Sequence, residues 1–263
     1  MEAARLFLIP VVKEEICKNL SFEEIIRFRD ALGLSSLKCS ICITDPKSSQ
    51  KIILPGVNLT TIEAYELIKK RGLNLAFIKA AKQGLNSVVK ILIAGGVDID
   101  TTDQWKETSL LLASNYNHLE VVQTLIANGA NVNVKDINGR IALMYASNEG
   151  HFEIAQILID NESNIDEADE DGWTALMFAS LTGRNLIIQI LIEHGANVDA
   201  GDQLGKTALM HASANGHLEV VQTLIAGGAD VGAVDLGEYT ALFDASINNH
   251  HRIVEYLKEH GAE

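Results

Sequence analysis

Apolar residues recur in two kinds of short helical pattern along residues 72–263. The longer pattern is an amphipathic segment such as residues 217–225, where Val220, Val221, Leu224 and Ile225 fall on one helical face. The shorter pattern is rich in small residues, which keep a helix thin enough for neighbours to stack closely: Ala113, Ala146, Ala179 and Ala212. The chain is therefore predicted to repeat a unit of turn, short helix, turn, second helix and loop.

These units follow a fixed period of 33 residues. The sequence Thr-Ala-Leu-Met-x-Ala-Ser begins at Thr174 and again at Thr207. The same phase is occupied by Leu75, Thr108, Ile141, Thr174, Thr207 and Thr240. A period of this length indicates a stack of similar small units, in which each helix pair leaves apolar surface open until a neighbour covers it.

The residues before each first helix are typical of a tight turn. An Asp that can bond nearby backbone opens the turn, and in most copies a Gly that tolerates positive φ follows three residues later. The Thr after the turn is predicted to be the N-cap of the first helix. Ile141 replaces it in one copy, at an expected cost of about 0.5–2 kcal/mol. Lys106 and Glu238 stand where the other copies have the Gly.

With these features in place, residues 72–263 resemble the ankyrin repeat. Four features match the consensus of that family: the turn that opens with Asp, the Thr-x-Leu start of the first helix, the Gly-His turn, and the closing Gly-Ala-Asp-Val of residues 228–231. The resemblance implies an all-α solenoid of about six helix-turn-helix units and a protein-binding role without catalysis. No copy keeps the family's Pro, and Met144, Met177 or Met210 stands at the family's His. That His normally ties adjacent turns, so this array is expected to depend more on apolar packing.

The resemblance also implies where a partner protein binds, namely on the turn tips and the concave face of the first helices. Their positions within the 33-residue period place both tryptophans and three of the five tyrosines on this surface. Exposed aromatic residues are common interface anchors. The alternative is that these rings stack on one another as structure. The predicted partner-binding residues are Gln104, Trp105, Tyr116, Arg140, Tyr145, Asn148, Glu149, Glu170, Trp173, Phe178, Leu181, Lys206, His211 and Tyr239.

Neither a catalytic nor a metal site is predicted, and no cofactor is expected. Four histidines lie at the Gly-His turn and are expected to bond backbone there: His118, His151, His217 and His250. The others have no metal-ligand spacing within a repeat. The sequence has no Gly-rich phosphate loop, nucleophile elbow or zinc-protease motif.

Charge narrows the class of partner. Residues 71–263 hold 11 basic and 26 acidic residues, a net charge of −15, whereas residues 1–70 contribute +1 to the total of −14. Such acidity disfavours nucleic acid, and either attracts a basic protein or only aids solubility. No apolar run approaches the roughly 18 residues of a membrane span. We expect a cytoplasmic protein without a membrane partner and a monomer, although the sequence does not determine the oligomeric state.

The first seventy residues lack the repeat and form a separate part of the chain. Residues 1–37 are predicted to be helical, and residues 38–71 to form a linker hairpin or loop followed by a capping helix that packs on the first repeat. Cys39 and Cys42 have the spacing of a zinc half-site or redox pair, but no second pair accompanies them, and ordinary small apolar residues explain them equally. An active site in this short segment is the remaining alternative, and no nucleophile–base pair can be named for it.

Residues 9–29 resemble an F-box. The matching residues are Pro10, Ile16, Leu20, Ile25 and Phe28, although the segment is one residue short after the Pro and lacks a later aromatic. The resemblance implies contact of Pro10, Ile16, Leu20 and Ile25 with the Skp-type adaptor of a cullin-RING ubiquitin ligase. The array would then hold the substrate, a role that suits a pathogen effector in a host cytoplasm. The alternative is a helical cap packed on the repeats.

Overall fold

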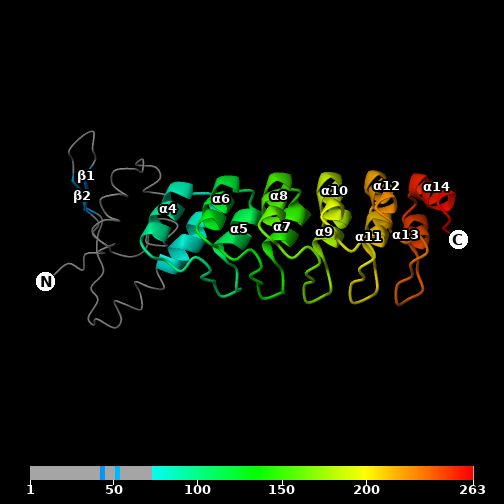
Figure 1. Cartoon of the computed structure of the whole chain (residues 1–263), viewed down its shortest axis with the longest axis horizontal. Helices are drawn as coiled ribbons and strands as arrows, with labels where there is room; N and C mark the ends of the chain where they lie inside the picture. The colour runs from blue at the N-terminus through cyan, green and yellow to red at the C-terminus, as the bar shows by residue number, and fades with distance from the viewer. Residues whose placement is uncertain (1–41, 45–50, 54–72, 263) are drawn as a thin grey trace. The chain divides into compact units, whose positions relative to one another are not determined.

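The computed structural model describes residues 42–44, 51–53 and 73–262 (Figure 1). The F-box-like segment, the predicted capping helix and Cys39 lie outside these residues. Contacts between residues divide the chain into two compact units, Met1–Ala130 and Asn131–Glu263. The boundary falls within the repeats, whereas the sequence placed a division before residue 72.

The first unit contains a short hairpin and two helix pairs. β1 (Cys42–Thr44) pairs antiparallel with β2 (Lys51–Ile53), in register Cys42 to Ile53, within the segment where a hairpin or loop was expected. Residues 73–82 form a helix that is followed by α4 (Asn86–Ala94). α5 (Ser109–Asn115) and α6 (Leu119–Ala127) form the second pair.

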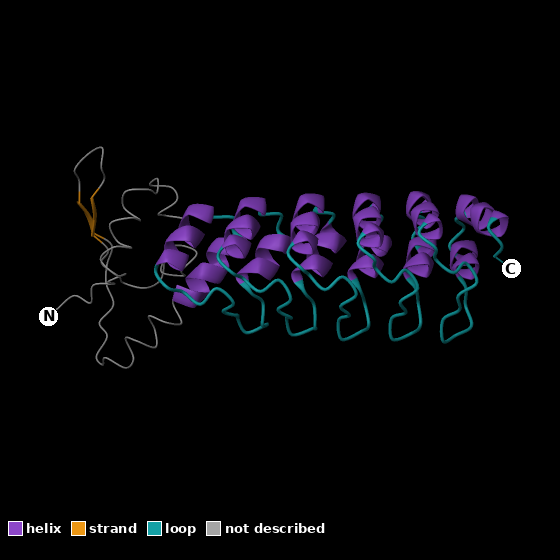
Figure 2. Ribbon diagram, viewed as in Figure 1, coloured by secondary structure: helices purple, strands orange, loops and turns teal. Residues whose placement is uncertain are grey.

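The second unit contains four helix pairs. They are α7 (Ala142–Glu149) with α8 (Phe152–Asp160), α9 (Ala175–Thr182) with α10 (Asn185–Glu193), α11 (Ala208–Ala214) with α12 (Leu218–Ala226), and α13 (Ala241–Ile247) with α14 (His251–Glu259). Each first helix packs on the next first helix, and each second helix on the next second helix. Long loops project from one side of the helices (Figure 2). The six helix pairs of the described residues confirm the predicted all-α repeat solenoid.

Apolar side chains fill the space within and between the pairs. Leu143, Met144, Leu176, Met177 and Ile187 are each at most 2% exposed. Met144, Met177 and Met210 thus pack as apolar residues at the position where the ankyrin consensus has His. A tight interior of this kind needs small residues beside large ones, and Ala146, Ala179 and Ala212 are fully buried.

The N-caps of the first helices differ among the repeats. The hydroxyls of Thr108, Thr174 and Thr240 accept from the backbone N–H three residues later, as predicted. Thr207 occupies the same position but its buried hydroxyl makes no cap hydrogen bond, so the prediction is wrong there. Ile141 is fully buried, so its apolar side chain offsets the missing cap.

Lys106 and Glu238 take the left-handed backbone conformation that Gly provides in the other turns. Their φ values are 57° and 61°, against 81° for Gly139 at the same phase. The turn therefore keeps one shape in every repeat, and the two non-glycine residues bear backbone strain.

Candidate functional site

The projecting turns are held by one aspartate in each repeat. Oδ1 of Asp136 accepts from the backbone N–H of Asn138 at 2.8 Å and of Arg140 at 2.9 Å. The same two bonds recur two and four residues beyond the other turn aspartates, which are Asp103, Asp169, Asp202 and Asp235. The tips are thus fixed by local hydrogen bonds, as the Asp-x-x-Gly pattern indicated.

Adjacent tips of the second unit are also joined through their backbones. Glu170 N–H donates to Asn138 O at 2.9 Å, Gln203 N–H to Asp171 O at 3.0 Å and Leu236 N–H to Leu204 O at 2.9 Å. The turns of the second unit are therefore tied together by backbone hydrogen bonds although the family's His is absent.

In the second unit, the Oδ2 oxygen of each turn aspartate contacts a side chain in one of two ways, and these two ways alternate from repeat to repeat. In one kind of repeat the donor lies nine residues later: Tyr145 Oη is 2.6 Å from Asp136 Oδ2, and His211 Nε2 is 3.1 Å from Asp202 Oδ2. In the other kind a basic residue reaches across from the preceding turn. Arg140 Nε lies 3.0 Å from Asp169 Oδ2, and Lys206 Nζ lies 3.7 Å from Asp235 Oδ2.

The alternation follows from the residue nine positions after each aspartate. Phe178 cannot donate, and Asp244 is itself an acceptor, so neither can serve the aspartate of its own repeat. Lys206 bonds Asp244 as well, at 3.0 Å. The backbone N–H of Tyr239, with further help from Gly237 and Lys206, lowers the pKa of Asp235 and keeps it ionised.

Aromatic rings pack along the same surface of the second unit. Trp173 contacts Phe178 and His211, with ring centroids 5.2 and 4.2 Å apart. The Arg140 guanidinium lies 4.9 Å from the Phe178 ring centre. Burial lowers the pKa of His211, and the carboxylate of Asp202 only partly opposes this effect. Trp173, Phe178 and His211 therefore stack as structure, the alternative that the sequence left open.

The predicted partner-binding residues consequently fall into three groups. Phe178 and His211 are each 8% exposed, and the Trp173 ring packs against both. Half-buried residues are Arg140, Tyr145, Asn148, Trp173, Leu181 and Lys206. Exposed residues are Gln104, Trp105, Tyr116, Glu149, Glu170 and Tyr239.

Three of the four histidines at the second turn bond backbone, as predicted. His118 Nε2 lies 2.9 Å from Lys82 O, His217 Nε2 3.0 Å from Leu181 O and His250 Nε2 3.1 Å from Ala214 O, each in the preceding repeat. Arg184 makes the equivalent bond to Asn148 O in the repeat that lacks this histidine. These side chains therefore link consecutive repeats by hydrogen bonds.

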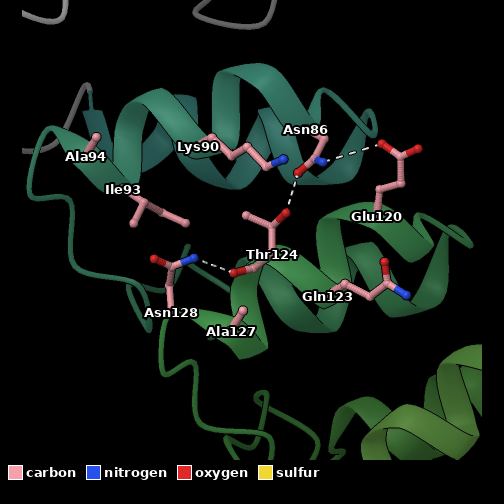
Figure 3. A pocket seen from close by; sticks show the side chains of 9 residues that line it. All are labelled: Asn86, Lys90, Ile93, Ala94, Glu120, Gln123, Thr124, Ala127 and Asn128. Carbon is pink, nitrogen blue, oxygen red and sulfur yellow. Dashed lines mark hydrogen bonds between the residues drawn. The ribbon is translucent and has the colours of Figure 1, made fainter.

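A groove of about 740 Å³ lies between α4 and α6 in the first unit (Figure 3). Asn86 donates to Glu120 at 3.4 Å and accepts from Thr124 at 2.8 Å. Asn185 makes the same two bonds to Glu219 and Thr223, between α10 and α12. The polar contacts thus serve helix stacking.

Residues 42–44, 51–53 and 73–262 contain no group of three or more His, Cys, Asp or Glu side chains arranged to hold a metal ion. Within the same residues no helix is both long and apolar enough to traverse a bilayer.

Comparison with known proteins agrees with this geometry. A family model described as ankyrin repeats (3 copies) matches residues 77–169, 161–235 and 202–263. No curated protein matches the chain. Ankyrin repeats are generally protein–protein interaction modules and are typically not enzymes. With most of its length matched and its helix pairs stacked in register, this chain belongs to the ankyrin repeat family.

Proposed function

We propose that this chain binds a partner protein through the turn tip and first helix of the α5–α6 repeat, with Trp105 and Tyr116 as anchors. The observation that carries the proposal is the exposure of Trp105, whose side chain is 55% exposed on the projecting turn. Tryptophan is among the residues most enriched at the energetic centres of protein interfaces, so an exposed indole on a projecting turn is suited to anchor a partner.

The turn presents Trp105 on a rigid backbone. Asp103 Oδ1 accepts from the N–H of Trp105 at 2.8 Å and of Glu107 at 3.0 Å. Asp103 N–H donates to Glu107 O at 3.1 Å, which closes the base of the turn. A partner that binds here does not have to order the loop, so less free energy is lost on association.

Tyr116 lies at the other end of α5 and is 46% exposed. The Nζ of Lys82 lies 5.1 Å from its ring centre, a cation–π contact that holds the ring in place. The tip and the end of one first helix thus each present an oriented aromatic ring, with polar Gln104 beside the first.

Charge favours a partner rich in Lys and Arg. In the second unit Lys135, Arg140 and Lys206 are each engaged by a carboxylate. Residues 131–239 hold 17 acidic and four basic residues, and Glu170 and Asp171 are exposed at one tip. A basic partner is drawn toward this acidic field, so its association should weaken as salt is added.

Affinity capture with the full chain identifies the partner, and titration of the purified partner then tests the surface. Trp105→Ala and Tyr116→Ala should each weaken binding by about tenfold or more, the effect of losing an interface anchor. Gln123→Ala is the matched control, because Gln123 is exposed on α6 in the same unit. Wild-type affinity in the Trp105→Ala variant would overturn the proposal.

A second candidate function rests on the F-box-like residues 9–29: recruitment of the bound protein to a cullin-RING ubiquitin ligase in a cytoplasm that holds a Skp-type adaptor. Binding of the purified adaptor to the full chain tests it. Ile16→Asp with Leu20→Asp should abolish binding, while Trp105→Ala leaves it unchanged. If the wild-type chain does not bind the adaptor, this function is ruled out.

A further inference from the structure

The turn between α9 and α10 differs from the equivalent turns of the neighbouring repeats at two positions. Arg184 stands where the next repeat has His217. Leu186 stands where the preceding and following repeats have Glu153 and Glu219. This turn lies at the other end of α9 from the projecting turn tip. At one place the second unit therefore has a guanidinium and an apolar side chain instead of an imidazole and a carboxylate.

The Arg184 side chain is held in one orientation by the preceding repeat. Its Nε donates to Asn148 O at 3.2 Å. Its aliphatic part lies against Gly150, because a Cβ on that glycine would be 2.9 Å from both Cδ and Nε of Arg184. Within residues 73–262 the two Nη groups have neither a hydrogen bond nor an ion pair. They are therefore oriented and available to a carboxylate, which arginine binds through two parallel hydrogen bonds.

Arg184 is the one basic residue of residues 131–239 that no carboxylate of the described chain pairs, although this segment holds 17 acidic residues. The other basic residues of the segment each have a carboxylate partner: Lys135, Arg140 and Lys206. Glu149 precedes Gly150 in the chain, but its Oε1 accepts from Asn148 Nδ2 at 2.8 Å. Glu219 likewise accepts from Asn185 Nδ2 at 2.8 Å. The charge of Arg184 is thus left without a partner in an acidic unit.

The stacking of the repeats requires neither substitution. His217 Nε2 lies 3.0 Å from Leu181 O, so an imidazole makes the link to the preceding repeat that Arg184 makes here. Leu186 is 61% exposed, so its side chain contributes little to the core. A glutamate suits the first turn of a helix better, since it interacts favourably with the helix dipole, and Glu153 and Glu219 are placed in this way.

We propose that Arg184 and Leu186 form a second protein-binding surface, which takes a partner segment that carries one Asp or Glu side chain next to apolar residues. The carboxylate accepts from both Nη groups of Arg184, and an apolar side chain covers Leu186. Arginine is suited to this role because its planar donors match a carboxylate and are weakly hydrated. The two residues are two positions apart in the chain, so a single short segment reaches both.

The acidic residues of the second unit limit the charge of this segment. They repel a segment with several carboxylates, so a single carboxylate between apolar residues fits best. The surface contains no residue of the proposed site around Trp105, and it selects a carboxylate where the rest of the unit attracts basic groups. It is therefore independent of the proposed function.

The test uses the nitrogen-15-labelled full chain and follows the NMR signals of the Arg184 Nε–H and the Leu186 backbone N–H. The probe is the peptide acetyl-Ala-Leu-Glu-Leu-Ala-amide, and the comparison peptide has Gln in place of Glu. The Glu peptide should shift both signals to saturation at millimolar concentration. The Gln peptide should bind about tenfold more weakly or less, because it lacks the charge that Arg184 pairs.

Two variants restore residues that the neighbouring repeats have at these positions, so both should keep the fold. Arg184→His retains a donor for Asn148 O, as His217 shows, and Leu186→Glu restores the acidic first turn. Each should weaken binding of the Glu peptide by about tenfold or more while the urea midpoint of unfolding stays as in the wild type. Leu204→Glu is the matched control, because Leu204 is 62% exposed on a turn tip and the substitution adds the same charge.

Four results would each overturn the proposal. They are a Glu peptide that leaves the Arg184 signal unmoved, a Gln peptide that binds equally well, wild-type binding by Arg184→His, and a loss in Leu204→Glu as large as that in Leu186→Glu. Binding of the captured partner through Trp105 should be unchanged in Arg184→His, so the two sites can fail separately.

Discussion

The indole of Trp173 lies against the imidazole of His211 in the next repeat, with ring centroids 4.2 Å apart. The imidazole is 8% exposed and its Nε2 lies 3.1 Å from Asp202 Oδ2. Because burial outweighs the attraction of Asp202, the pKa of His211 is lowered. The charges that face it are Asp202, Lys206 and Asp244. Helix α11 therefore contains a buried histidine that the fold keeps neutral.

The first prediction is a loss of stability in mild acid. The unfolded chain binds a proton at His211 with a pKa of about 6.5, above that of the folded chain. The free energy of unfolding should therefore fall as pH drops below that value, and this contribution is constant above it. His211→Tyr is the matched variant, because Tyr145 makes the equivalent bond to Asp136 and the ordinary pKa of a tyrosine hydroxyl, about 10, lies well above this pH range. Urea unfolding at pH 7.5 and 5.5 should show a smaller loss for His211→Tyr; equal losses would contradict the assignment.

The second prediction concerns the two tryptophans. Trp173 contacts Phe178 and His211, whereas Trp105 is 55% exposed on its turn. Trp173→Ala should lower the free energy of unfolding by about 2–3 kcal/mol, less than for a fully buried ring. Trp105→Ala should change it by less than about 0.5 kcal/mol. Urea unfolding followed by circular dichroism measures both, and a comparable loss in Trp105→Ala would show that this ring, too, is structural.

The third prediction tests the basic residue that bridges two repeats. Lys206 is 3.0 Å from Asp244 and 3.7 Å from Asp235, and both carboxylates are 8% exposed. Lys206→Met leaves Asp244 without its ion pair, so it should destabilise the chain by about 2 kcal/mol or more. Lys135→Met is the control, since the Lys135 side chain is 46% exposed and such pairs contribute at most about 1 kcal/mol.

A second substitution should recover much of that loss. Asp244→Phe places an apolar ring at the phase of Phe178, where the structure already accommodates one. Combined with Lys206→Met, it removes the unpaired carboxylate, so the double variant should be more stable than Lys206→Met alone. If the double variant loses the sum of both single effects, the two residues are not coupled.

Much of the fold could be predicted from the sequence because the contacts that form it join residues that are close together in the sequence. The 33-residue period predicts the helix pairs, and the turn aspartates bond backbone only two and four residues away. The cross-repeat contacts were not predictable, since Arg140 meets Asp169 and Trp173 meets His211 only through the way repeats stack. A signal was present nonetheless. Basic and aromatic residues alternate at the same phase, in the order Arg140, Trp173, Lys206 and Tyr239.

Burial likewise explains where the sequence misjudged the surface. Their positions within the 33-residue period place Phe178 and His211 on the inner side of the first helices, and this side would be exposed on an isolated helix. The Trp173 ring covers both, and phase gives no information about a neighbouring ring.

The last prediction concerns Ile141, the residue that replaces the capping Thr. Ile141→Thr restores a hydroxyl that could accept from Met144 N–H as Thr108 accepts from Leu111 N–H at 3.2 Å. Such a cap contributes about 1 kcal/mol. Ile141 is fully buried, however, and removing its apolar carbons forfeits about 0.8 kcal/mol for each methylene and leaves a small cavity. Thr207 shows that a buried Thr at this phase can lack the cap bond altogether.

The loss should therefore exceed the gain, and Ile141→Thr should destabilise the chain by about 1 kcal/mol. Ile141→Val is the control, because it removes one methylene and adds no hydroxyl, so the difference between the two variants isolates the cap. Urea unfolding measures both. A stabilised Ile141→Thr chain would mean that the missing cap, rather than the buried side chain, dominates at this position.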